Sequence, residues 1–399
     1  MSPAEKVDLV LIGSGPHNLT LASFLTQTDP SWASRLAVID PSGRWLAQWD
    51  RQMAAQEIVH LRSSSVHHPD PDPLALRKFA PGRSLEFYPP YALPGVGVFR
   101  EFCEHVITRR GLKERVFQGR VSDLVPDSGG WNVVLSNGEA LKARAAVLAL
   151  GGGSPSIPNF ALPWIEEGRR DLSLLHSDEV DLGALPPGEE RVVIVGSGLT
   201  AGHLALGALK RGYQVALLAR RTPVFKLFDA APGWIGPKYM TQFHAQSDWK
   251  KRRRMILRAR GRGAMTEEVR DLLAPYRRSG QLVWKARCPV SKLERSGRGW
   301  EVVCGRKTFT AGKVWLCTGT QIDLHGLGFL ERVLADYPAD WVDGLPILEE
   351  SCRWPGVPLY LMGPLAGLRV GPVARNLPGA RQAASRIVQA LTGVRVPAN

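Results

Sequence analysis

The chain carries one pattern twice: an apolar strand, a Gly-x-Gly turn and the start of a helix. The first copy is VDLVLIGSGPHNLTLASFL at residues 7–25, and the second begins RVVIVGSGLTAGHLALGALK at residue 191. A β-branched apolar run of this kind is typical of a buried parallel strand. A glycine turn between such a strand and a helix points backbone amides and the positive end of the helix dipole at an anion. The duplication predicts an α/β fold with two Rossmann-like dinucleotide-binding domains.

The first copy is a variant of the dinucleotide fingerprint, because Asn18 stands where a third glycine is usual. Its second strand, residues 36–40, ends in Asp40, which lies 27 positions after Gly13. A carboxylate at this place can accept hydrogen bonds from an adenosine ribose. A tight glycine turn without a ligand is the alternative. The predicted dinucleotide-binding residues are Gly13, Gly15, Pro16, His17, Asn18 and Asp40.

The second copy follows the fingerprint more closely, as G-x-G-x-x-A, and a predicted helix at residues 200–210 leads into a strand at 214–218. Where the first copy has an acid, this copy has two arginines. A carboxylate would repel a 2′-phosphate, whereas guanidinium groups pair with it bidentately. Ordinary surface charge is the alternative for the arginines. The predicted NADPH site consists of Gly196, Gly198, Leu199, Thr200, Ala201, Arg220 and Arg221.

Each half of the chain also contains a later predicted strand that is followed directly by glycine. A predicted strand at residues 145–150 leads into Gly151, and residues 314–320 repeat that arrangement. Near the C-terminus, an apolar run precedes Gly363 and Gly371, and a helix is predicted at residues 379–391. A strand, a glycine and a helix start can present further amides to the first cofactor.

Residues 41–100 lack clean periodicity and are rich in Trp, His and Pro, which predicts chain without regular elements over a ligand or an active-site mouth. We predict no metal site there, because neighbouring side chains beside prolines diverge; the residues weighed are His67, His68, Asp70 and Asp72. The elements predicted next are a helix at 98–108 and strands at 115–124, 131–135 and 140–144.

The net charge of +14 is concentrated in residues 250–262 (KKRRRMILRARGR), where eight of thirteen residues are basic. Such a run can bind nucleic acid, an acidic membrane surface or an acidic partner. No aromatic residues interleave with it and no nucleic-acid-binding module accompanies it. A solvated helix face is therefore the favoured interpretation.

Other features point to an ordinary globular protein. No apolar run approaches the roughly 20 residues that span a bilayer, and MSPAEKVDLV lacks the order of a signal peptide. We therefore expect a cytoplasmic location. The five cysteines are scattered without a C-x-x-C motif, which argues against a disulfide framework, a zinc site and a redox dithiol. The oligomeric state stays open.

With its two nested units, the chain resembles the two-domain flavoprotein oxidoreductases, and among them the N-hydroxylating flavin monooxygenases (ornithine and lysine N-monooxygenases). The opening GSGPHNLTLA is similar to that family's G-x-G-P-x-N-L-A-L-A. Further similarities lie in a flavin-covering segment with Trp49, Met53 and His60, in the pair His176-Ser177, in RTPVFKLFDAAPGW at residues 221–234, and at Gly371 and Arg381. The F-x-G-x-x-x-H fingerprint of flavin-containing and Baeyer–Villiger monooxygenases is absent.

The resemblance implies FAD in the first site and NADPH in the second. It also implies that residues 1–186 and 320–399 form the FAD-binding domain, with an NAD(P)H-binding domain at 187–319 inserted in it and a basic substrate or lid region at about 225–285. Trp49, His60, Gly151, Gly363 and Gly371 then join the FAD site.

The implied reaction consumes NADPH and O₂ and oxygenates an amine nitrogen of a small molecule through a flavin C4a-hydroperoxide. No catalytic side chain is identified, because such chemistry is centred on the cofactor. The substrate stays open, since the family's Phe-x-Asn-Glu element is replaced by WIGPK at residues 234–238. Lys238 and the basic run would suit a substrate with a carboxylate. The alternatives are a reductase or dehydrogenase without oxygen insertion, and a non-enzymatic flavoprotein that docks a partner.

Overall fold

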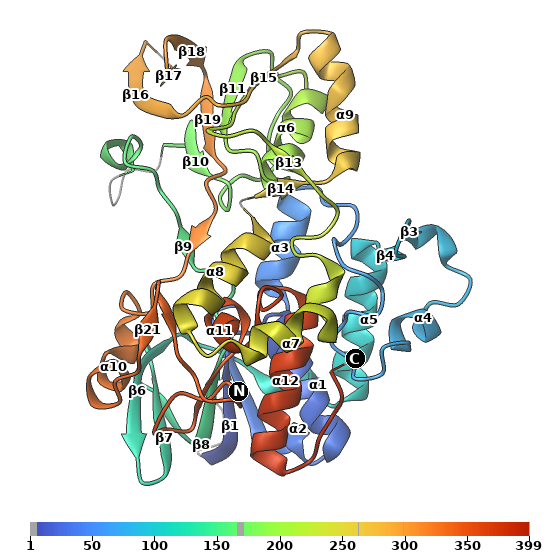
Figure 1. Cartoon of the computed structure of the whole chain (residues 1–399), viewed down its shortest axis with the longest axis vertical. Helices are drawn as coiled ribbons and strands as arrows, with labels where there is room; N and C mark the ends of the chain where they lie inside the picture. Colours follow the sequence, from blue (N-terminus) through green and yellow to red (C-terminus); the bar gives the residue numbers. More distant parts are fainter. Residues whose placement is uncertain (1–5, 166–170, 262, 298, 399) are drawn as a thin grey trace.

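The computed structural model describes residues 6–165, 171–261, 263–297 and 299–398. The chain forms two lobes, each built on a mainly parallel sheet with helices against it (Figure 1). The first and last parts of the chain form one lobe, and the middle part forms the other. The predicted α/β fold, with a second Rossmann-like unit inserted into the first, is confirmed.

The first sheet has seven strands within the described residues, in the order β5-β2-β1-β8-β7-β6, with β23 beside β8. β8 is parallel to β1 and β23 and antiparallel to β7. In this register Leu9 of β1 pairs with Leu36 on one side and Ala145 on the other. The strands are β1 (Lys6–Ile12), β2 (Leu36–Asp40), β5 (Val116–Gln118), β6 (Val121–Asp127), β7 (Gly130–Leu135), β8 (Ala140–Leu148) and β23 (Leu359–Leu361).

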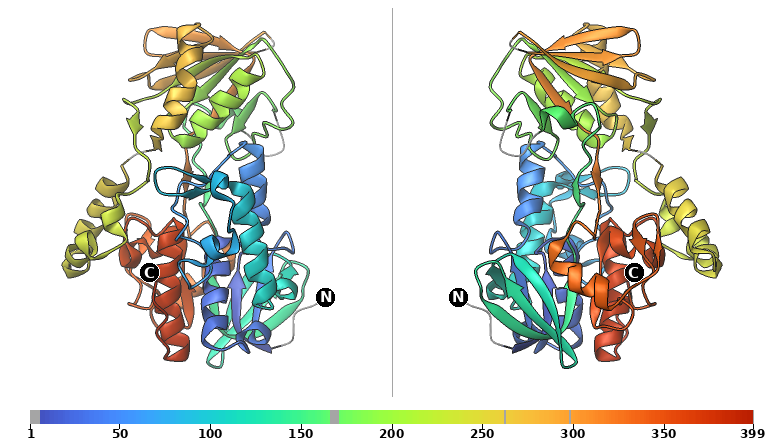
Figure 2. Two further views of the ribbon diagram at one scale, coloured as in Figure 1. Left: turned by 90° about the vertical axis from the view of Figure 1, so that its right-hand side faces the viewer. Right: turned by 90° about the vertical axis from the view of Figure 1, so that its left-hand side faces the viewer.

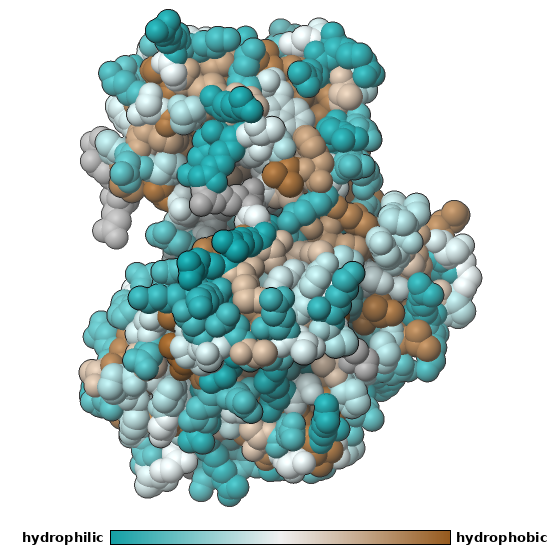
Figure 3. All heavy atoms as spheres, viewed as in Figure 1, coloured by the Kyte–Doolittle hydropathy of each residue, from teal (hydrophilic) through white to brown (hydrophobic). Residues whose placement is uncertain are grey.

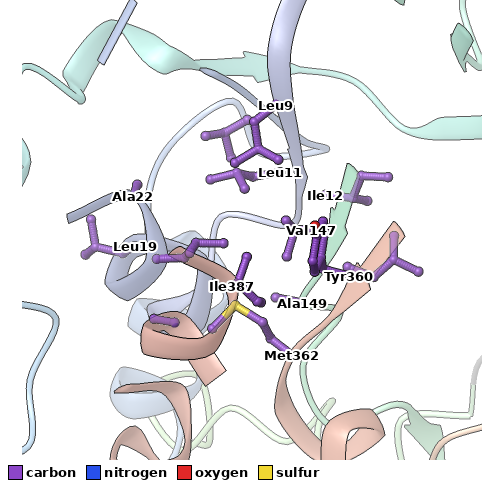
Figure 4. Packing of buried hydrophobic residues seen from close by; sticks show 14 of the residues in the cluster. Leu9, Leu11, Ile12, Leu19, Ala22, Val147, Ala149, Tyr360, Met362 and Ile387 are labelled. Atoms are coloured by element: carbon purple, nitrogen blue, oxygen red, sulfur yellow. The ribbon is translucent and has the colours of Figure 1, made fainter. Parts of the chain in front are cut away.

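The core of this lobe joins segments from both ends of the chain. Helix α1 (Pro16–Thr28) packs against the C-terminal helix α12 (Leu377–Thr392). Figure 4 shows Leu19 of α1 and Ile387 of α12 in one cluster with Met362, and all three are buried. Burying one such side chain contributes roughly 1.5–3 kcal/mol. The C-terminal segment therefore completes a core that the first unit begins.

The stretch 41–100 contains regular elements, contrary to the prediction. Helix α3 (Ala47–Ala55) and helix α4 (Ala75–Phe79) lie in it. No residue of α3 is fully buried, so no apolar stripe marked it as a helix. The remaining elements of this lobe are α2 (Trp32–Arg35), β3 (Phe87–Tyr88), β4 (Leu93–Pro94), α5 (Val96–Arg109), α10 (Glu331–Asp336), β21 (Trp341–Val342), β22 (Leu345–Pro346) and α11 (Gly367–Val370).

The second sheet is parallel throughout, in the order β10-β19-β11-β12-β15. Helices α6 and α9 cover one face, and a three-stranded antiparallel sheet covers the other, where Trp300 shares a buried cluster with Val193 and Val314. The elements are β10 (Leu174–His176), β11 (Arg191–Val195), α6 (Leu199–Lys210), β12 (Gln214–Leu218), α9 (Glu267–Arg278), β15 (Leu282–Lys285), β16 (Val290–Ser296), β17 (Gly299–Cys304), β18 (Lys307–Ala311) and β19 (Lys313–Leu316).

Two short strands, β9 (Ser154–Pro155) and β20 (Thr320–Gln321), pair where the chain passes between the lobes. The predicted domain boundary at residue 186 stays a prediction. β10 pairs with β19 and so belongs to the second sheet, although it precedes that boundary. A three-residue strand carries too little pattern to show which sheet it joins.

Two further details correct the predictions. The segments 140–144 and 145–150 were expected as separate strands, but residues 140–148 form the single strand β8, because its first half pairs with β7 and its second half with β1 and β23. Cys288 and Cys304, expected to be unpaired, are bonded to each other, with Cα atoms 5.4 Å apart. The antiparallel pairing of β16 and β17 brings them together, which their spacing in the sequence does not reveal.

The basic run forms part of a helix pair, α7 (Pro237–Ala245) and α8 (Trp249–Arg260), that lies outside the two sheets. α8 contacts α11 and β21 of the first lobe, and Figure 2 shows the pair on the outside of α12. The polypeptide enters this helix pair after β13 (Val224–Phe225) and leaves it through β14 (Ala264–Met265), and these two strands pair with each other. Arg262, in the basic run, lies outside the described residues. Among the described residues, no helix is long and apolar enough to cross a membrane.

Candidate functional site

The first glycine turn is tightly packed on one side and open on the other. Gly13 has a φ of +96°, and a Cβ there would lie 2.7 Å from the carbonyl oxygen of Ala149. Gly15 precedes α1, and a Cβ there would meet no atom within 4 Å. No side chain caps the N-terminus of α1. The turn therefore leaves helix amides open above Gly15, where an anion can bind.

The next three residues hold this turn in place. Pro16 is the first residue of α1. The Nε2 atom of His17 lies 3.0 Å from the carbonyl oxygen of Ala374, and burial lowers the pKa of His17. Asn18 is fully buried, and its Nδ2 donates to the carbonyls of Ile12 at 3.0 Å and Gly13 at 2.6 Å. Asn18 thus lies beneath the turn and fixes its shape from inside.

Asp40 lies at the end of β2, beside the same turn. One carboxylate oxygen accepts a hydrogen bond from the amide of Ser14 at 3.0 Å, and the other accepts from the amide of Ser42 at 2.8 Å. The carboxylate is partly exposed. An acid therefore stands next to the open helix end, in the arrangement that the spacing from Gly13 predicts.

The three glycines that follow later strands, Gly151, Gly363 and Gly371, lie in different places. Gly151 follows β8 and is exposed, with a φ of +73°. Gly363 has a φ of +69° and faces the His17 ring, 3.9 Å from the position of a Cβ. Gly371 has a φ of +83°, and a Cβ there would lie 3.1 Å from Sδ of Met240 on α7. Gly363 therefore borders the first turn, whereas Gly371 joins the C-terminal segment to α7.

The second glycine turn repeats the geometry of the first. Gly196 has a φ of +146°, and a Cβ there would collide with the carbonyl of Cys317. Gly198 precedes α6, whose N-terminus also has no side-chain cap. Ala201 is fully buried in the core of this lobe. The other predicted residues are Leu199 and Thr200, both partly buried at the start of α6, and Arg220 and Arg221, both exposed after the end of β12.

The segment that the resemblance predicts to cover the flavin bridges the two lobes. Trp49 packs on the first core, with its ring centroid 5.5 Å from that of Phe99. His60 stacks on Tyr88 with centroids 4.5 Å apart, and its Nε2 lies 2.9 Å from a carboxylate oxygen of Glu268 on α9. Trp49 and His60 therefore have different surroundings, one in a core and one at the contact between the lobes.

A charged cluster that the sequence analysis missed lies at this contact. The carboxylate of Asp229 accepts from Arg62 at 2.8 Å, from Arg260 at 3.1 Å and from the side-chain amide of Asn376 at 3.3 Å. Burial opposes ionisation of Asp229, but the two guanidinium groups hold its pKa below the ordinary value. Three segments far apart in the sequence thus meet at one carboxylate. The signals were present, because Asp229 lies in RTPVFKLFDAAPGW and Arg260 in the basic run.

A cavity of about 210 Å³ lies beside this cluster. Apolar groups including Tyr91, Phe228 and Ile235 form much of its wall, together with Arg62, Asp229 and Asn376. The rings of Tyr91 and Phe228 are 5.2 Å apart. A mostly apolar cavity with a few convergent polar groups is the usual form of a small-molecule site.

The histidines and acids that were weighed as metal ligands serve the local structure. His68 is buried against the edge of Phe102, with Nε2 3.3 Å from the carbonyl of Pro73. Asp70 accepts from Arg109 and Arg110, and Asp72 from Lys78. In the described ranges, no group of three or more His, Cys, Asp or Glu side chains is arranged to hold a metal ion.

Two Rossmann-like units, one inserted in the other, define a dinucleotide-binding fold, and the comparisons agree. Residues 10–153 match a family model described as FAD-NAD(P)-binding. That match covers the first glycine turn, Asp40 and Gly151 after β8. No curated protein sequence matches the chain.

Solved structures match almost the whole chain. The FAD-bound cadaverine monooxygenase of desferrioxamine biosynthesis from Erwinia amylovora has a TM-score of 0.77 and 16% identity, covering 98% of this chain and 96% of that one. The ornithine hydroxylase of Pseudomonas aeruginosa, in reduced form, has a TM-score of 0.76 and 18% identity, covering 96% and 98%. The ornithine N-hydroxylase of Kutzneria sp. 744, with reduced FAD, NADP⁺ and L-ornithine, has 0.75 and 18%, covering 97% and 99%. The chain thus has the fold of N-hydroxylating flavin monooxygenases. The resemblance predicted from its motifs is confirmed for the fold.

Proposed function

We propose that this protein is an FAD-dependent, NADPH-consuming monooxygenase that oxygenates an amine nitrogen of a small molecule. The observation that carries the proposal is the pair of uncapped helix N-termini, each behind a glycine turn, with Asp40 beside one and Arg220 and Arg221 near the other. This pair suits two different dinucleotides. The shared fold with a cadaverine monooxygenase and two ornithine hydroxylases supports amine oxygenation.

In this proposal the first turn holds FAD. The open amides of α1 bind its pyrophosphate, Asp40 accepts from its ribose, and His17 and Gly363 border the same space. Asn18 acts indirectly, by holding the turn from beneath. The FAD-binding domain consists of residues 1–186 and 320–399, except that β10 contributes to the second sheet. The glycine turn fits the group, since the space that a side chain would fill at Gly15 is open.

The second turn holds NADPH in residues 187–319. The amides of α6 bind its pyrophosphate, and the guanidinium groups of Arg220 and Arg221 bind its 2′-phosphate. When bound, FAD would supply the redox chemistry, in which NADPH provides two electrons as a hydride, one oxygen atom of O₂ goes to the substrate and the other leaves as water. The chain itself supplies binding, orientation and exclusion of water.

The substrate amine occupies the cavity of about 210 Å³ beside Asp229. Arg62 and Arg260 already pair with that carboxylate, so the cluster carries an excess of positive charge. Such a field disfavours a protonated amine and favours the neutral, nucleophilic form that oxygen transfer requires. The chain therefore contributes to the reaction by holding the amine in its reactive protonation state.

The decisive test is the mass of a product. The FAD-loaded protein is incubated in air with NADPH and a panel of amines, including cadaverine, ornithine and lysine. We expect one amine to stimulate NADPH oxidation and to gain one oxygen atom. NADPH oxidation that needs an added quinone and yields no oxygenated product would show a reductase instead. Absence of flavin binding would overturn the proposal altogether.

A further inference from the structure

The cations of α8 fall into two sets with different environments. Arg252 is buried, donates to the carbonyls of Gln246 at 2.6 Å and His244 at 2.7 Å, and stacks on Trp249. Arg253 reaches Asp343, and Arg260 reaches Asp229. These inner arginines fasten α8 to the rest of the chain. The expectation that the whole run is a solvated face is therefore wrong for this set.

The outer set behaves differently. Lys250, Lys251, Arg254 and Arg258 are exposed. Among the described residues, the ion pairs made by α8 are those of Arg253 and Arg260, so these four cations form none. Figure 3 shows hydrophilic side chains gathered over α8. Three of these cations line a groove of about 650 Å³ between α7 and α8, together with Tyr239 and Trp234. The fold thus leaves a row of positive charges on an open groove.

The groove has the composition of a protein-binding surface. Trp, Tyr, Met and Arg are the residues enriched at protein interfaces, and Trp234, Tyr239, Met255 and Arg254 all line it. The Trp234 ring already packs against Tyr239 at 5.3 Å and Phe243 at 6.1 Å between centroids. In the described wall of the groove the aromatic residues are Trp234 and Tyr239, which contact each other, so the groove has no row of separated aromatic faces on which successive bases could stack.

The spacing of the cations specifies the shape of the partner. Lys251, Arg254 and Arg258 stand at positions i, i+3 and i+7 of α8, so they share one face over about 10 Å. Carboxylates at the same spacing on another helix would lie opposite them. A second copy of this chain would bring the same positive row and a net charge of +14, so it does not complement the groove.

We propose that the α7–α8 groove docks an acidic helix of a partner protein, with carboxylates opposite Lys251, Arg254 and Arg258. One helix face buries less than a standard interface, so the contact is transient and salt-sensitive, and charge complementarity speeds its formation. The proposal is independent of the cofactor assignment, because none of these three cations belongs to either dinucleotide site.

The test measures binding of an alanine-based helical peptide that carries Glu at positions i, i+3 and i+7. A peptide of the same composition with a central proline serves as the non-helical probe. Oligo-dT and phosphatidylcholine vesicles containing phosphatidylglycerol represent the other anionic partners. The protein variants are R254E/R258E and the matched control R277E/R278E, whose exposed arginines occupy the last turn of α9. Near-ultraviolet circular dichroism and thermal unfolding show whether both variants fold.

We expect the helical peptide to bind wild type and the control variant equally, and R254E/R258E at least roughly tenfold more weakly. Equal losses in both variants would reduce the effect to the overall charge and overturn the proposal. Equal affinity for the proline peptide would refute a helical partner. Tighter binding of oligo-dT or vesicles, with the same loss in R254E/R258E, would assign the groove to nucleic acid or membrane instead.

Discussion

A guanidinium nitrogen of Arg62 lies 2.8 Å from a carboxylate oxygen of Asp229, although 167 positions separate the two residues. Arg62 belongs to the segment that crosses between the lobes, and its remaining donors reach the backbone carbonyls of Leu227 and Lys226. The other oxygen of Asp229 accepts from Arg260, which also donates to the carbonyl of Pro372 at 2.7 Å. One carboxylate therefore joins the covering segment, α8 and the C-terminal segment beside the cavity.

We expect Asp229→Asn to lower the unfolding free energy by roughly 1–3 kcal/mol, because two guanidinium groups would lose their countercharge in a partly buried place. Denaturation by urea measures the change. The matched control is Glu294→Gln, which breaks the exposed ion pair with Lys292 and should cost less than about 1 kcal/mol. A double-mutant cycle with Arg62→Gln should show coupling. Equal costs for the two carboxylate variants would mean that the cluster contributes no more than a surface pair.

Gly15→Ala should abolish retention of FAD while leaving the apoprotein stable. The backbone at Gly15 is extended, with φ −76° and ψ 178°, so alanine fits without strain. A Cβ there would meet no protein atom within 4 Å, but it would occupy the space proposed for the pyrophosphate. Flavin absorbance after gel filtration and thermal unfolding of the apoprotein measure the two effects. Gly97→Ala, at an equally open position in α5, is the control and should retain flavin. Normal flavin content in the Gly15 variant would place the cofactor elsewhere.

Replacing Arg220 and Arg221 by alanine should raise KM for NADPH roughly ten- to a hundredfold and leave KM for NADH nearly unchanged. The reason is that charge-assisted hydrogen bonds to the 2′-phosphate would be lost, and NADH has no such group. Steady-state oxidation of each cofactor measures the ratio. Arg278→Ala, which removes an exposed arginine of the same lobe, controls for net charge. A parallel rise in both KM values would assign the arginines a structural role.

Acid should destabilise the folded protein through three histidines. Burial lowers the pKa of His67, of His68 and of His203 from 6.5 to about 4. Between these values the unfolded chain binds a proton at each position and the folded chain does not. The unfolding free energy should therefore fall as the pH drops through this window, by about 1.4 kcal/mol per unit for each histidine. Above pH 7 these groups should add no pH dependence.

Denaturant titrations at several pH values give this slope. The substitution His68→Gln removes one of these imidazoles, so the slope of the unfolding free energy against pH should fall by the contribution of one histidine. This expectation holds whatever the substitution does to stability at neutral pH. Substitution of the exposed His105 provides the comparison. An unchanged slope in the His68 variant would show that this imidazole titrates normally in the folded protein.

Local pattern was enough to predict both glycine turns. The predicted strands at residues 7–12 and 36–40 correspond to β1 and β2, and the strand at 214–218 corresponds to β12. The helix after the second turn begins at Leu199, one residue before the predicted start. These features depend on short-range causes: apolar periodicity, the positive φ of Gly13 and Gly196, and the uncapped start of a helix. None of them requires knowledge of a distant partner.

Long-range contacts decided the rest. Asn18 looked like a ligand contact, yet it is buried under the turn, because only the packed fold shows which way its amide faces. Local pattern also could not show that β10 joins the second sheet or that Cys288 meets Cys304. Such pairings depend on which strands become neighbours, and a strand of three residues carries no mark of its partner.

The basic run and the charged cluster show the same division. By itself, the sequence determined that the chain has two dinucleotide-type units, with an acid in one and arginines in the other, because strand, turn and helix signals are local. Only the tertiary structure decided that Arg260 pairs with Asp229 while Arg254 and Arg258 face an open groove. The physical reason is that the residue type alone gives the charge of a side chain, whereas its burial and its partners depend on how distant segments pack.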